Sequence, residues 1–144
     1  MSTTTKPDLT ITTTEHRNVQ RLRDGFDAFS RGDLDAVRAT LSADCTWTLV
    51  GTGPLAGTYQ GWDAIQGMFG ALFEATGGTF SMDVISVLAN DTHAVAIYDA
   101  TSTVKGVTDT QRFVLIDEMT PDGLVRSTQG LAYDQAAADA HISR

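Results

Sequence analysis

The chain has 144 residues, 42% of them apolar, and its 18 acidic and 10 basic residues give a formal net charge of −8. This length and composition predict one globular domain with its own core. Nucleic-acid binding is excluded because phosphates require clustered Lys and Arg, and the sequence has no basic run. We expect the acidic surface to serve solubility.

The single cysteine, Cys45, excludes an intrachain disulfide and a cysteine-based zinc site. It lies in a predicted strand, where we expect a buried, inert thiol. No apolar run reaches the roughly 20 residues that span a bilayer. The N-terminal MSTTTKPDLTITTTEH lacks the apolar segment of a secretory signal. We therefore expect a cytoplasmic protein without membrane contacts.

Three helices are predicted in the first half of the domain. Residues 1–14 are threonine-rich and are expected to be a disordered tail before a domain at 15–135. The first helix is expected from 14 or 15 to 31, and the second, capped by Asp33, at 34–41. A strand at 45–50 and a glycine-rich loop at 51–61 lead to a third helix from 62 to about 76.

After Thr79 the hydrophobic period changes from 3.6 to 2. Turn signals separate four expected strands at about 79–89, 93–104, 108–119 and 124–133, which short connections would join as an antiparallel meander. Residues 136–144 are expected to be a tail or short helix. The predicted fold class is α+β: a cone-shaped, twisted antiparallel sheet packed on three N-terminal helices, with an internal pocket.

Four segments resemble the nuclear transport factor 2-like superfamily, and within it the SnoaL-like group. They read FSRGDLDAVRATLSADCTW (29–47), GPLAGTYQGWDAI (53–65), GGTF (77–80) and DGLV (122–125). The resemblance covers about residues 15–133 and implies a homodimer in which a second copy covers the outer sheet face. The superfamily includes ketosteroid isomerases, limonene-type epoxide hydrolases, polyketide cyclases, dehydratases and noncatalytic binding domains, so the fold alone does not decide function.

The resemblance places no ketosteroid isomerase chemistry in this chain. The general-base position holds Leu49, the two oxyanion-donor positions hold Gly25 and Leu115, and the supporting tyrosines are replaced by Leu41 and Phe69. The strand that carries the Arg-x-Asp pair of limonene-type hydrolases reads AVAIYDATST and contains no Arg. Both mechanisms are therefore disfavoured.

The register of the superfamily implies which side chains of the last strands enter the pocket. The inward set is Ala96, Tyr98, Ala100, Ser102, Asp109, Gln111, Phe113, Leu115, Thr128, Gly130 and Ala132. The apolar outward set, for the dimer, is Val95, Ile97, Val114, Ile116, Val125 and Leu131. A slip of one residue would exchange the two sets.

Three inward residues are the catalytic candidates. The Tyr98 phenol could donate a hydrogen bond to a carbonyl or oxyanion, Gln111 could orient a ligand, and a desolvated Asp109 could shuttle a proton. The structural alternatives are a core tyrosine with a hydrated hydroxyl, a satisfied or rim glutamine and a solvated carboxylate beside a turn.

The candidates for ligand contact are mainly apolar side chains expected around the pocket. They are Phe26, Trp47, Leu49, Tyr59, Trp62, Met68, Phe69, Phe73, Phe113, Leu115 and Thr128. Tyr59 and Trp62 would form either an aromatic lip or a helix anchor, and Trp47 could instead serve the core or the dimer.

The other ionisable residues are expected at the surface. Asp99 and Asp117 are interpreted as surface or interface charges, and His16, His93 and His141 as surface residues without a metal. The sequence has no phosphate loop and no dinucleotide fingerprint, so no cofactor is implied.

Two functions remain open. The first is a cofactor-independent cyclase, isomerase or dehydratase acting on a cyclic or polyketide-like substrate, with a hydrophobic small molecule in the pocket. The second is a noncatalytic ligand-binding or dimerisation module of the same fold.

Overall fold

Three helices form in the first half of the chain, as predicted. The computed structural model describes residues 16–144. The expected tail at 1–14 and the expected helix start at 14–15 lie outside these residues. Helix α1 spans Arg17–Ser30, α2 spans Leu34–Ala39 and α3 spans Gly61–Ala75. The His16 ring accepts a hydrogen bond from the Asn18 amide at the start of α1, and the Asp33 carboxylate accepts one from Ala36 at the start of α2.

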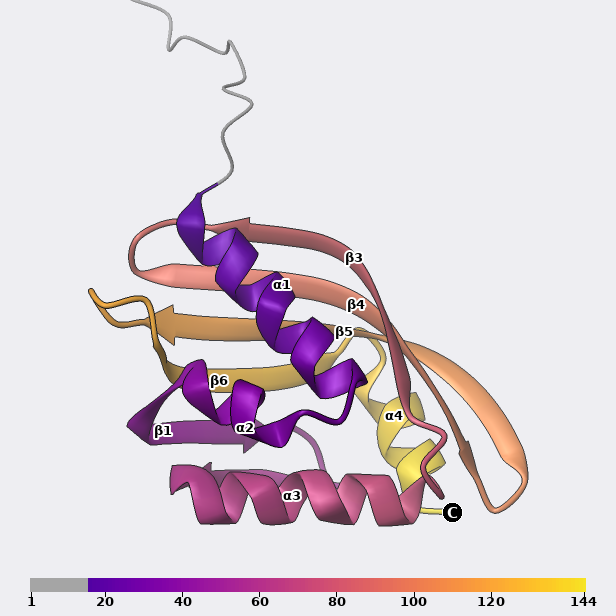
Figure 1. Ribbon diagram of the computed structural model, residues 1–144. Helices are drawn as coiled ribbons and strands as arrows, with labels where there is room; N and C mark the ends of the chain where they lie inside the picture. The colour runs from indigo at the N-terminus through magenta and orange to yellow at the C-terminus, as the bar shows by residue number, and fades with distance from the viewer. Residues whose placement is uncertain (1–15) are drawn as a thin grey trace, which may run out of the picture.

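The six strands form one curved, open sheet (Figure 1). They are β1 Leu41–Leu49, β2 Gly57–Gln60, β3 Ser81–Ala89, β4 His93–Val104, β5 Val107–Met119 and β6 Val125–Ala132. Their order is β2-β1-β6-β5-β4-β3. The predicted meander is confirmed for β3 to β6. The prediction of a fully antiparallel sheet was wrong, because β1 lies parallel to β6.

The first strand and the loop after it also differ from the prediction. Strand β1 begins at Leu41 rather than at Cys45. Part of the predicted loop forms β2, which pairs antiparallel with β1 and brings the Thr48 and Thr58 hydroxyls to 3.0 Å. A four-residue strand between glycines carries too short an alternation to be recognised by its period.

Turn geometry and bulges fix the register of the long strands. Lys105 and Gly106, with φ of 48° and 80°, make the tight turn between β4 and β5. The pairing of β5 with β6 shifts between Glu118 and Met119, so that Val125 pairs with Met119 and is buried. The predicted outward position of Val125 was therefore wrong, because the extra residue reverses the alternation of side chains.

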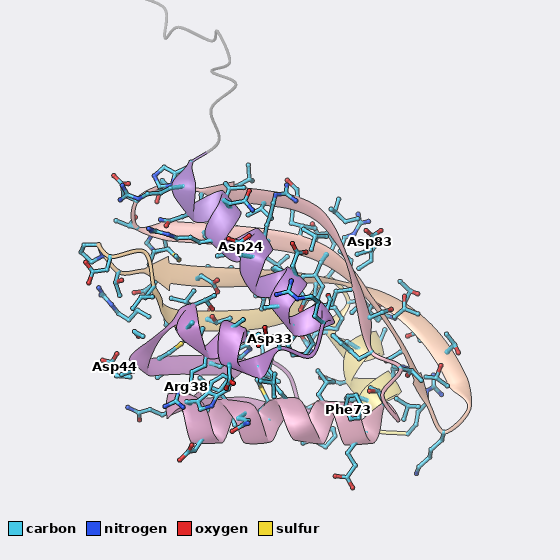
Figure 2. The ribbon with its side chains drawn as sticks, viewed as in Figure 1. Asp24, Asp33, Arg38, Asp44, Phe73 and Asp83 are labelled. Atoms are coloured by element: carbon cyan, nitrogen blue, oxygen red, sulfur yellow. The ribbon has the colours of Figure 1, made fainter. Side chains whose placement is uncertain are left out.

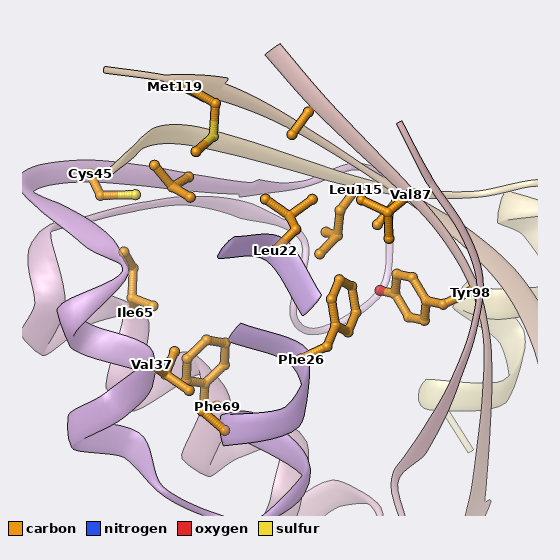
Figure 3. Packing of buried hydrophobic residues seen from close by; sticks show 14 of the residues in the cluster. Leu22, Phe26, Val37, Cys45, Ile65, Phe69, Val87, Tyr98, Leu115 and Met119 are labelled. Atoms are coloured by element: carbon orange, nitrogen blue, oxygen red, sulfur yellow. The ribbon is translucent and has the colours of Figure 1, made fainter. Parts of the chain in front are cut away.

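The helices α1, α2 and α3 lie on one face of the sheet, and α4 (Gln135–Ile142) lies at the end away from the β5–β6 hairpin (Figure 1). Between the helices and the sheet is the core, in which Leu22 and Phe26 of α1 lie near Val87, Tyr98 and Leu115 of the strands (Figure 3). Charged side chains such as Asp24, Asp33 and Asp83 are exposed on the outside (Figure 2). Within residues 16–144, no helix has the length and apolar character needed to cross a bilayer.

Candidate functional site

A cavity of about 130 Å³ lies between α1, α2, α3 and the concave face of the sheet. We call it the inner cavity. Gly25, Leu41, Leu49, Phe69 and Leu115 all line it. These are the five positions that the resemblance assigned to isomerase chemistry, and here their side chains are apolar or absent.

Asp117 is the unexpected residue of the inner cavity. Its side chain lines the cavity and is only 4% exposed, so the predicted surface position was wrong. The Thr128 hydroxyl on β6 donates a 2.8 Å hydrogen bond to Asp117 Oδ1. Loss of hydration raises the pKa of Asp117 to about 7, and the bond from Thr128 opposes this rise. At neutral pH this carboxyl can therefore both take up and release a proton.

Tyr98 lies on β4 and is buried in the same cavity. Its ring meets Phe26 edge to face at a centroid distance of 5.3 Å and stacks on Phe113 at 5.7 Å. The hydroxyl is turned toward Phe26 (Figure 3). Burial and the negative charge of Asp117 raise the pKa of Tyr98, so its phenol stays protonated and can donate a hydrogen bond.

A second cavity, of about 140 Å³, lies between the sheet and α4, and we call it the end cavity. Gln111 and Asp109 line it, and the Gln111 amide donates a 2.7 Å hydrogen bond to Asp109 Oδ2. This bond lowers the pKa of Asp109. Asp109 is thus an ionised acceptor and a weaker base than Asp117. Tyr98 lines both cavities.

His141 is buried at 6% exposure beside the end cavity, so its predicted surface position was wrong. Its Nε2 lies 3.0 Å from Ser102 Oγ and 3.1 Å from the Ser102 carbonyl oxygen. Arg144 Nε donates to His141 Nδ1 at 3.1 Å, so the neutral ring carries its proton on Nε2. That proton faces Ser102, and the pair is therefore a structural tie for α4 rather than a base and nucleophile.

Most ligand-contact candidates line one or both cavities. The inner cavity is lined by Phe26, Trp47, Leu49, Met68, Phe69, Leu115 and Thr128, and the end cavity by Leu49 and Phe113. Tyr59, Trp62 and Phe73 line neither. The Tyr59 hydroxyl donates to the Leu55 carbonyl, and the Arg38 guanidinium lies 5.9 Å from the centroid of the Trp62 ring.

Phe73 was wrongly assigned to the inward face of α3. Its side chain is 66% exposed near the end of α3 (Figure 2). Ile65, Met68 and Phe69 of the helix are buried, and each residue of an α-helix turns by about 100°. Phe73 therefore lies to one side of the stripe that these residues form.

Other ionisable groups add little chemistry. Cys45 is buried, as predicted, and burial together with Asp117 and Asp44 raises the pKa of its thiol to about 12. Asp99 pairs with Arg112 through bonds of 2.8 and 3.1 Å. Among residues 16–144, no three His, Cys, Asp or Glu side chains are grouped closely enough to hold a metal.

Comparison of the sequence with known protein families shows to which family the chain belongs. The family model of the SnoaL-like domain matches residues 22–127. The chain belongs to the SnoaL-like domain family. The expected superfamily and the α+β cone are thereby confirmed, and the SnoaL-like domain has a small-molecule-binding fold of the nuclear transport factor 2 type.

The similarity to known proteins extends over most of this SnoaL-like domain. An uncharacterized protein of Mycobacterium tuberculosis is 27% identical over 88% of the chain and 96% of its own length. The structure of Bal32a, from a soil-derived mobile gene cassette, is 27% identical with a TM-score of 0.82 and covers 88% of this chain and 96% of its own. TerC, co-crystallized with polyporic acid, is 18% identical with a TM-score of 0.78, covering 88% and 98%.

The missed residue Asp117 carried a usable signal in the sequence. It lies two residues after Leu115 in β5, so alternation places it on the inward face with Gln111 and Phe113. A charged residue near a strand end is nevertheless usually solvated, so the residue type alone predicts a surface position. Thr128 opposite it on β6 supplies the hydrogen bond that a buried carboxyl needs.

Proposed function

We propose that this SnoaL-like domain is a cofactor-independent cyclase, isomerase or dehydratase that acts on an apolar cyclic or polyketide-like ketone. Asp117 is the acid–base group and Tyr98 the oxyanion donor. The observation that carries the proposal is the buried carboxyl of Asp117, poised to titrate near neutral pH, in a mostly apolar cavity that also holds a phenol.

The proposed chemical step is proton abstraction from the carbon beside a ketone. The ionised Asp117 takes the proton, and the electrons of the C–H bond move onto the ketone oxygen to form an enolate. The Tyr98 phenol donates a hydrogen bond to that oxygen. The enolate carbon then attacks a second carbonyl of the same molecule, which closes a ring, and Asp117 returns its proton to the new alkoxide oxygen. In a substrate with a C=C bond next to the enolate, Asp117 instead returns the proton to the far carbon of that bond, which shifts the double bond and isomerises the substrate.

Contacts around the two groups support these roles. Thr128 holds Asp117 Oδ1, which leaves Oδ2 for a substrate proton. Phe26 and Phe113 fix the Tyr98 ring from two sides. The indole N–H of Trp47, in the wall of the same cavity, is buried and has no hydrogen-bond partner among residues 16–144. A ligand oxygen beside it would satisfy this donor.

The experiment is exchange of the α-protons of 2-tetralone, an apolar bicyclic ketone, in D₂O, followed by NMR. We expect the wild-type protein to accelerate exchange above the buffer rate. Asp117→Asn should lower the catalysed rate about 10²–10⁴-fold, and Tyr98→Phe about 10²–10³-fold, the range seen for one lost oxyanion donor.

Asp122→Asn is the matched control, because Asp122 is exposed on the β5–β6 hairpin and should leave the rate unchanged. Exchange at the buffer rate with wild-type protein, or full activity of Asp117→Asn, would contradict the catalytic proposal. If 2-tetralone still bound in either case, the noncatalytic ligand-binding function would be favoured instead.

We further propose that two copies pair through the outer sheet face. Two cross-strand rows of apolar side chains lie there: Leu88–Val95–Ile116 and Ile97–Val114–Leu131. Leu88 is 64% exposed and Ile116 37% exposed in the single chain. Light scattering should give a dimer mass for the wild-type protein and a monomer mass for Ile116→Lys. A monomeric wild-type protein at 100 μM would contradict this pairing.

A further inference from the structure

Four residues line both the inner and the end cavity: Leu49, Leu72, Phe80 and Tyr98. The two cavities are therefore neighbours, with these residues between them. The volumes are similar, about 130 and 140 Å³. Two neighbouring spaces of this kind can hold the two ends of one elongated molecule when the side chains between them turn aside.

The polar groups of the two cavities differ in kind. The inner cavity has Asp117 with Thr128 and is also lined by Arg21, whereas the end cavity has Asp109 and Gln111 on the neighbouring part of β5 and, among the residues that the structure describes, is lined by no Arg or Lys. One N–H of Gln111 bonds to Asp109. Within residues 16–144, the Gln111 carbonyl oxygen has no hydrogen-bond partner. A carboxylate and an amide oxygen both accept hydrogen bonds, so they suit a ligand hydroxyl and repel a ligand carboxylate.

The outer wall of the end cavity is fixed in place by α4. The Asp139 carboxylate accepts hydrogen bonds from the Thr52 amide at 2.9 Å and from Gln135 Nε2 at 2.9 Å. A Cβ on Gly51 would lie 2.5 Å from Asp139 Oδ1, so the loop approaches this carboxylate as only glycine allows. These contacts of Asp139 and the buried His141–Ser102 contact together hold α4 against the sheet.

We propose that the two cavities form one bipartite binding site for an elongated, neutral, largely apolar molecule that carries a hydroxyl on the end lying in the end cavity. The reacting part of the ligand lies beside Asp117, and the hydroxylated part lies against Gln111 and Asp109. This assignment of a substrate class rests on the proposed small-molecule function of the inner cavity.

Three rigid, neutral probes test it: styrene, trans-stilbene and trans-4-hydroxystilbene, with dissociation constants from isothermal titration calorimetry. We choose styrene as a probe short enough for one cavity and the stilbenes as probes long enough to extend into both. We expect 4-hydroxystilbene to bind at least tenfold more tightly than styrene. Ala138 lines the end cavity and is 7% exposed, so Ala138→Phe should weaken 4-hydroxystilbene at least tenfold and change styrene less than twofold.

Ala140→Phe is the matched control, because Ala140 is exposed on the same helix and should affect neither probe. Gln111→Met keeps the side-chain length but removes the amide, so this variant should bind 4-hydroxystilbene no more tightly than stilbene. If Ala138→Phe does not fold, Gln111→Met tests the bipartite site by itself. Equal losses for styrene and 4-hydroxystilbene, no loss with either variant, or no binding of the stilbenes would overturn the bipartite site.

The same measurements separate this inference from the catalytic proposal. Asp117→Asn should retain 4-hydroxystilbene binding within threefold. If that variant also keeps full 2-tetralone exchange, the catalytic role fails while the bipartite site stands. If exchange depends on Asp117 but Ala138→Phe leaves 4-hydroxystilbene binding unchanged, the bipartite site fails and the catalytic role stands.

Discussion

Asp109 and Asp117 lie on the same strand and by alternation face the same side of the sheet, yet their environments differ. Asp117 is 4% exposed and bonded to Thr128, whereas Asp109 is partly exposed and bonded to Gln111. Burial raises the pKa of Asp117 to about 7, and the Gln111 bond lowers that of Asp109. The comparison shows that depth in the cone, more than residue type or strand face, decides which carboxyl can act as a base near neutral pH.

The largest expected difference between the two carboxyls is in catalysis. Exchange of 2-tetralone by the wild-type protein should rise with pH and level off above an apparent pKa of about 7, because Asp117 must be ionised to accept a proton. Asp109→Asn should keep this profile and change the plateau less than threefold. If Asp109→Asn abolished the pH dependence of exchange and Asp117→Asn left it unchanged, the two roles would be reversed.

A second contrast concerns stability. A carboxyl whose pKa is raised by folding costs stability once it ionises. The cost begins above the unfolded pKa near 4, grows until the pH reaches the folded value of about 7, and is constant above it. Asp117→Asn should therefore raise the free energy of unfolding at pH 8 by roughly 4 kcal/mol at most and much less at pH 4.5.

Urea unfolding at the two pH values measures this effect. Asp109→Asn serves as the control from the same strand and should show no such gain at pH 8, because its pKa is lowered rather than raised by its surroundings. Equal stabilisation of both variants, or a gain for Asp117→Asn confined to pH 4.5, would contradict the buried state of Asp117.

The support of Asp117 by Thr128 gives a smaller effect. Thr128→Val keeps the shape but removes the donor 2.8 Å from Asp117 Oδ1. We expect a loss of about 1–3 kcal/mol in the free energy of unfolding at pH 8, because a buried charged acceptor is left unsatisfied. The apparent pKa of the exchange profile should also move upward. Ser127→Ala, on the adjacent and half-buried position of β6, is the comparison and should leave that pKa unchanged.

The smallest effect is expected at Asp109. The Gln111 amide is the main cause of its lowered pKa, so Gln111→Ala should move the pKa of Asp109 upward in an NMR titration. The pKa of Asp117 should stay in place, since the two carboxyls have separate hydrogen-bond partners. A coupled change in both would show that the cavities do not act as distinct environments.

The sequence by itself determined the period of each long element and, through the family resemblance, most of the inward face. Tyr98, Gln111 and Leu115 all line a cavity as expected, because strand alternation is a local property that survives any packing. The helix expected up to residue 31 likewise forms, and its Leu22 and Phe26, four residues apart on one face, lie in the core.

Only the tertiary structure decided where that alternation breaks and which polar groups are buried away from water. The bulge that buries Val125 and the parallel pairing of β1 with β6 depend on contacts between distant strands. Asp117 and His141 are buried, and Thr128 and Ser102 from other elements are their hydrogen-bond partners there. Desolvation is set by everything packed around a group, so a local pattern in the sequence cannot report it.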